Sequence, residues 1–127
     1  MKLNPDCIRD ILIFVEQNTS HNTIIRVYSN SNDILPLYDK DEFFYHVEQC
    51  IMADFIIGEV FSNSCKIKCL TPKGHTFLEN IRQNTIWNKV KDHAKQVGSF
   101  SLESIFQISS TVISEVIKKH LNLLWYL

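Results

Sequence analysis

Apolar residues recur at helical spacing in five segments of the chain. Asn4 is a favoured N-cap residue, Pro5 suits the first helical turn, and apolar residues then follow at i, i+3, i+4 and i+7. Asp39 and Glu42 have the spacing of a capping box and open a second such segment. We therefore predict helices over residues 5–18, 40–52, 72 to at least 81, 86–97 and 102–121.

Three other segments are rich in β-branched and aromatic residues and predict short strands. They cover residues 23–28, 55–61 and 66–70. The last two flank Ser62-Asn63-Ser64, whose residue types favour a turn, so we expect them to pair as a hairpin. Gly74 lies in the first turn of the following helix, where we expect it to permit close approach to a neighbouring strand.

The order of these elements is helix, strand, helix, hairpin and then three helices. Helix–strand–helix–hairpin is the order of a winged helix. We predict a mainly α protein with a small β-hairpin: a winged-helix unit over residues 1–83, followed by two further C-terminal helices over residues 84–127. This extension would pack on the first unit, giving one compact domain, or on a second protomer. Only residues 34–38 could hold the first helix of the helix-turn-helix, and Pro36 interrupts them.

Short motifs lie on both sides of the predicted hairpin: Tyr45-His46, Leu70-Thr71, Gly74-His75, Phe77-Leu78 and Trp87-Asn88-Lys89. In these motifs the chain resembles a family of uncharacterised domains from low-GC Gram-positive bacteria and their phages and prophages. The resemblance spans about residues 1–121. It implies a winged-helix-like fold and a phage or prophage origin, and it leaves the activity open. One departure is Asp54, where many relatives have a glycine.

The composition indicates an ordinary globular protein of 127 residues with 45% hydrophobic residues. The N-terminus lacks the apolar region of a secretory signal. The longest weakly charged stretch, residues 104–114, is far shorter than the roughly 20 residues of a membrane span. We therefore expect a cytoplasmic protein with reduced cysteines and no membrane contact.

No motif indicates catalysis, a cofactor or a metal. Lys73-Gly74-His75 lacks the preceding glycine of a phosphate-binding loop. Cys50 follows His46 at i+4, but Cys50 belongs to the apolar face of its helix, and a buried thiol is a poor nucleophile. We expect His46 and His75 to be structural histidines bonded to the backbone. The prediction is a protein that is not an enzyme.

The charge distribution supports a nucleic-acid hypothesis, which we rank second. Residues 1–61 carry four basic and ten acidic side chains, and residues 62–127 carry nine basic and four acidic ones. A DNA-binding regulator would use the basic wing side. Binding should be weak and salt-sensitive, because few phosphates would be contacted. The candidate contacts are Lys66, Lys68, Lys73, Lys89, Lys91 and Lys95.

The helix that precedes the wing would normally read the major groove. Its outward face has Asp41, Tyr45, Glu48 and Gln49 and no basic residue. Carboxylates would face phosphates there, so we predict that these four residues do not read bases.

The last helix supports the leading hypothesis, a non-catalytic protein that forms a homodimer or binds a host or phage protein. Its apolar residues occupy a wider stripe than one contact with the domain requires. One set of these apolar residues consists of Leu102, Ile105, Val112 and Val116. A second set, with the tail, holds the candidate self-association residues Phe106, Ile113, Ile117, Leu124 and Trp125. The alternative is that both sets are hidden inside one protomer.

Overall fold

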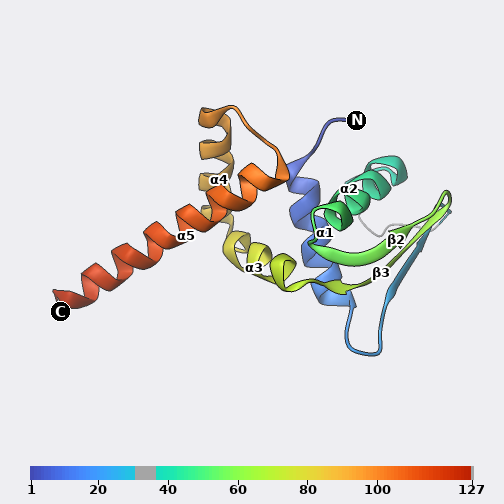
Figure 1. Ribbon diagram of the computed structural model, residues 1–127, viewed down its shortest axis with the longest axis horizontal. Coiled ribbons are helices and arrows are strands. Elements are labelled where there is room, and N and C mark those ends of the chain that lie inside the picture. The colour runs from blue at the N-terminus through green and yellow to red at the C-terminus, as the bar shows by residue number, and fades with distance from the viewer. Residues whose placement is uncertain (31–36, 127) are drawn as a thin grey trace. The chain divides into compact units, whose positions relative to one another are not determined.

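The computed structural model describes residues 1–30 and 37–126 and divides into two compact units, Met1–Leu78 and Glu79–Leu127. Over the described residues the protein is mainly helical, with one small three-stranded antiparallel sheet (Figure 1). The boundary between the two units was predicted from the sequence to lie slightly later, after residue 83. Residues 34–36 of the segment that the sequence offered for a further helix lie outside the described residues.

The first unit follows the predicted order. Its elements are α1 (Pro5–Asn18), β1 (Ile25–Tyr28), α2 (Lys40–Met52), β2 (Ile56–Val60), β3 (Ser64–Leu70) and most of α3 (Pro72–Ile81). The bounds of α1 and α2 agree with the prediction because caps fix both starts: Asn4 accepts hydrogen bonds from two backbone N–H groups of α1, and Asp39 accepts one in α2.

The predicted hairpin is confirmed, and the sheet has the order β1–β3–β2. β2 and β3 pair antiparallel, with a bulge between Ile57 and Gly58. β1 pairs antiparallel with β3, so that Arg26 lies opposite Lys66. One face of the sheet packs against α1 and α2 (Figure 1). Side chains alternate along the strands between this buried face and the exposed face.

His46 is fully buried and connects α1 to α2. Its Nδ1 lies 2.7 Å from the Glu42 carbonyl oxygen, and its Nε2 lies 2.8 Å from the Asn4 backbone nitrogen. A carbonyl only accepts and an N–H only donates, so Nδ1 carries the proton and Nε2 accepts. The prediction of a structural histidine is confirmed for His46. It is wrong for His75, which is exposed and whose ring has no hydrogen-bond partner among the described residues.

The start of α3 packs tightly against the start of β2. The Thr71 hydroxyl donates to the Asp54 carbonyl and accepts from the Gly74 N–H. A Cβ on Gly74 would lie only 2.0 Å from the Phe55 carbonyl oxygen. The expected close approach at Gly74 is therefore confirmed.

The end of α2 explains the departure at Asp54. The Asp54 N–H donates to the Ile51 carbonyl and the Phe55 N–H to the Cys50 carbonyl, which is a Schellman ending. Asp54 has φ of 64°, in the left-handed region where glycine is favoured. A glycine would suit this backbone.

The second unit contains α4 (Asn84–Val97) and α5 (Leu102–Trp125), which pack on each other. Gly98 ends α4 in a left-handed conformation, and the Ser101 hydroxyl caps α5. α5 continues to Trp125 rather than ending near residue 121. Over the described residues, no helix combines the length and the apolar character that crossing a bilayer requires.

Candidate interaction surfaces

The C-terminal half of α5 is exposed along its whole length. Ile105, Ser109 and Val112 in the first half are buried, whereas every residue from Ser114 to Tyr126 is exposed. Trp125 is 86% exposed. The exposed large apolar residues of this segment are Val116, Ile117, Leu121, Leu123, Leu124, Trp125 and Tyr126.

Four of the five predicted self-association residues form one line on α5, and the fifth, Trp125, lies off it. Phe106, Ile113, Ile117 and Leu124 are separated by seven, four and seven positions, which places them on one helical face. We call these four residues the apolar stripe. Phe106 and Ile113 are half-buried, and Ile117 and Leu124 are about half exposed, at 54% and 51%.

The grouping of Val116 needs correction: Ile105 and Val112 of its set are buried, whereas Val116 is 37% exposed. Within the second unit neither set is hidden beyond Ile113, because no later residue through Tyr126 is buried. Sequence reasoning could not find this limit, since it depends on how far α4 extends beside α5.

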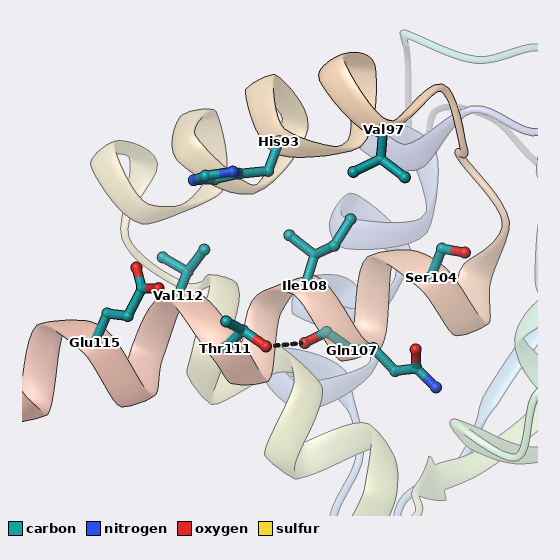
Figure 2. Close-up of a pocket in the computed structure, with 8 residues that line it drawn as sticks. All are labelled: His93, Val97, Ser104, Gln107, Ile108, Thr111, Val112 and Glu115. Carbon is teal, nitrogen blue, oxygen red and sulfur yellow. Dashed lines mark hydrogen bonds between the residues drawn. The ribbon is translucent and has the colours of Figure 1, made fainter.

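A groove of about 310 Å³ lies between α4 and α5 (Figure 2). The apolar walls of the groove come from Val97, Ile108 and Val112. Its end near Val112 also holds His93 and Glu115. The Thr111 hydroxyl is already bonded to the Gln107 carbonyl, at 3.2 Å. Over the described residues, no three His, Cys, Asp or Glu side chains are grouped as a metal site would need. This groove can accept an apolar side chain, and its residues offer no paired nucleophile and base.

Three of the four unpaired cysteines are buried, namely Cys7, Cys50 and Cys65. Burial raises the pKa of Cys7 to about 12, with smaller contributions from Glu42 and Asp10. Burial also raises the pKa of Cys65 to about 11 and that of Cys50 far above its usual value. Both nitrogens of His46 are bonded to the backbone, so this histidine does not activate the Cys50 thiol.

The six candidate lysines do not share one unit. Lys66, Lys68 and Lys73 belong to the first unit, and the other three, Lys89, Lys91 and Lys95, belong to the second. Two of the six lie over aromatic rings: the Lys73 Nζ is 5.4 Å from the centroid of the Phe55 ring, and the Lys91 Nζ is 5.5 Å from that of Trp87.

Lys66 and Lys68 are exposed on β3, and sequence reasoning missed the third cation beside them, Arg26. The strand at residues 25–28 was predicted, but its pairing with β3 was not. That pairing is what brings Arg26 opposite Lys66.

The exposed positions of α2 are acidic or apolar. Asp41 and Glu48 are exposed, as is Met52 at 64%. Tyr45 and Gln49 are half-buried. The only basic residue of α2 is Lys40, its first residue, and it is half-buried.

Comparison with known proteins places the chain in a family. The model of the family described as "Hypothetical protein (DUF2513)" matches residues 2–101. The chain is also similar to an "Uncharacterized protein" of Haemophilus influenzae, with 30% identity over 123 residues that cover 92% of this chain and 99% of that protein. No solved structure matches. Because the family model covers most of the sequence, including both units in part, the chain belongs to the DUF2513 family.

Proposed function

We propose that this protein is non-catalytic and acts by self-association through the C-terminal half of α5. The observation that carries the proposal is the unbroken exposure of residues 114–126, with Ile117 and Leu124 continuing the apolar stripe. The charged residues of this segment, Glu115, Lys118 and Lys119, lie on the opposite side of the helix by their spacing. A helix that is amphipathic beyond the body of its unit is suited to packing against another helix.

Energetics favour a partner for this segment. A helix of this length without tertiary contacts is marginal in water. Covering one large apolar side chain is worth roughly 1.5–3 kcal/mol, so exposing several together is costly. A second copy is always available, and a two-fold interface between identical surfaces is the commonest arrangement. A host or phage protein is the alternative partner.

We also infer that the first unit is a winged helix. The order α1–β1–α2–β2–β3 and the sheet order β1–β3–β2, with a helix before the hairpin, support this assignment. A cytoplasmic location is supported by the four unpaired cysteines. A phage or prophage origin is supported by the resemblance of the motifs around the hairpin.

A regulator that reads DNA with α2 is the weaker candidate. The exposed carboxylates of Asp41 and Glu48 would repel phosphates at the surface that should enter the groove. The exposed cations Lys66 and Lys68, which favour nucleic acid, lie on β3 and not on α2.

The test is the molar mass in solution. We expect light scattering coupled to gel filtration to give twice the 14.8 kDa mass of the chain at tens of micromolar. The double variant Ile117→Glu/Leu124→Glu should be monomeric, because each carboxylate would be buried without a partner. Asn122→Glu, on the charged side of the same helix, is the matched control and should leave the mass unchanged.

Two results would reject self-association. One is a monomeric mass across this range that does not change when residues 123–127 are deleted. The other is a dimer whose stability is the same in the double variant and in the control. If the chain is a monomer that binds anionic vesicles through this segment, the segment is an interfacial helix instead.

A further inference from the structure

The exposed face of the three-stranded sheet carries a charge and aromatic pattern that packing does not require. We call this surface the outer sheet face and define it by Arg26, Tyr28, Phe61, Lys66 and Lys68. All five side chains are exposed, Tyr28 at 52% and Phe61 at 50%. The alternate residues of β1 and β3, such as Val27 and Ile67, are buried on the other face.

The strand register arranges these side chains in rows. In one row Arg26 of β1 lies opposite Lys66 of β3, and Glu59 of β2 lies on the other side of Lys66. In the next row, toward the hairpin turn, Tyr28 lies opposite Ser64, and the Phe61 N–H donates to the Ser64 carbonyl at 2.7 Å. Two aromatic side chains therefore flank one small residue, beside a row that holds two cations and Glu59.

This charge arrangement is unfavourable for the sheet itself. Like charges directly opposite each other on paired strands destabilise the pair. Over the described residues, neither Arg26 nor Lys66 nor Lys68 takes part in an ion pair. Glu59 is the one acidic group among the outward-facing strand residues of the described sheet.

The clustering also stands out against the charge of the unit. Residues 1–78 carry seven basic and ten acidic side chains, a net charge of −3. Three of those seven basic groups are concentrated on the outer sheet face. A polyanion would relieve their mutual repulsion, so the local charge is complementary to phosphate.

We propose that the outer sheet face binds single-stranded nucleic acid. Tyr28 and Phe61 are separated by the width of one intervening strand, so their backbones are about 10 Å apart. That separation allows two bases to stack on separate rings. Arg26 and Lys66 lie two positions along the strands, about 7 Å from the aromatic row, and Lys68 lies four positions along, about 13 Å away. The sugar-phosphate chain would run along these cations. A duplex hides its bases and would use the cations alone.

The test is fluorescence anisotropy with a labelled 15-nucleotide single strand, as DNA and as RNA, against the intact chain. We expect micromolar binding that is tighter than binding to the corresponding duplex. The logarithm of the association constant should fall with the logarithm of salt concentration with a slope of about −2, since three cations contribute about −0.7 each on single strands.

Two variants distinguish stacking from charge. Phe61→Ala and Tyr28→Ala should each weaken single-strand binding at least five-fold, the lower end for losing one stacked base. Arg26→Glu/Lys66→Glu should weaken it more than ten-fold. The matched control, Lys118→Glu/Lys119→Glu, makes the same charge change on exposed residues of α5 that are not candidate contacts and should change the affinity less than two-fold. Thermal unfolding checks that each variant is folded.

Three outcomes would overturn the proposal. They are equal affinity for single strand and duplex with no effect of Phe61→Ala or Tyr28→Ala, equal losses from the Lys118→Glu/Lys119→Glu control, and binding only to anionic lipid vesicles. Single-strand binding by the outer sheet face does not depend on self-association through α5. The binding proposal can therefore fail while self-association holds, and self-association can fail while binding holds.

Discussion

At Asp54 the backbone has an unfavourable angle, and the fold tolerates its free-energy cost. Its φ of 64° is required by the Schellman ending of α2, because the two closing hydrogen bonds come from the N–H groups of Asp54 and Phe55. In this conformation the Cβ of an L residue crowds the backbone, which costs free energy. The cost is smaller for aspartate than for most other residues.

We predict that Asp54→Gly stabilises the protein by about 0.5–1 kcal/mol in urea unfolding, because glycine removes this crowding. Ala53→Gly, one residue earlier at φ of −82°, is the matched control and should give no gain. If Asp54→Gly were less stable than the parent chain, the aspartate side chain would have to contribute more than its strained backbone costs.

Local chemistry explains which single-residue features the sequence could reveal. Asn4 and Asp39 act as caps in the structure, and each was predicted from residue type and position alone. The left-handed angle at Asp54 could not be predicted in this way, since aspartate is not specific for it.

At the scale of elements, periodicity and caps predicted the helices α1 and α2 and the existence of the hairpin. They did not predict the pairing of β1 with β3 or the bulge at Ile57, because neither follows from a local pattern. The extension of α5 to Trp125 was also missed. Apolar residues in a tail predict burial somewhere, but they do not specify whether the backbone stays helical.

The contact between α3 and β2 provides a test at this scale. We predict that Gly74→Ala lowers the free energy of unfolding by about 2–3 kcal/mol, because the new methyl group would overlap the Phe55 carbonyl and force the two elements apart. Chemical denaturation followed by circular dichroism measures the change.

Gly98→Ala is the control for this substitution. Gly98 has φ of 80°, but nothing lies within 4 Å of a Cβ built there. Its alanine variant should therefore lose only about 1 kcal/mol, the conformational cost. Equal losses at the two positions would mean that the close contact of Gly74 with the Phe55 carbonyl costs no more than the left-handed backbone of Gly98.

At the scale of the whole molecule, the candidate residues were identified by type, but their grouping was not. The apolar stripe of α5 could be predicted because it lies on one helix, whose periodicity is visible in the sequence. The six lysines come from several elements, and the structure divides them between two units. Arg26 was overlooked because its value as a candidate depends on a strand partner 40 positions away.

The buried thiols make the stability of the whole fold sensitive to alkaline pH. Burial raises the pKa of the Cys7, Cys50 and Cys65 thiols above the ordinary value of 9.0. The pKa reaches about 12 for Cys7 and about 11 for Cys65. Below pH 9 these thiols are protonated in both the folded and the unfolded chain, so their contribution is fully present. Above pH 9 the unfolded chain releases protons that the folded chain retains. Stability must then fall as pH rises.

We predict that the free energy of unfolding declines between pH 9 and pH 11, by about 1.4 kcal/mol per pH unit for each thiol that stays protonated in the fold. Urea unfolding at pH 8, 9, 10 and 11 measures the slope. Cys65→Val should make the slope shallower by one thiol's share, because valine suits a buried strand position and does not titrate. Ile67→Val, buried on the same strand, should lower stability equally at every pH and leave the slope unchanged. A slope that is identical in Cys65→Val and the parent chain would show that this thiol ionises as readily in the fold as in the unfolded chain.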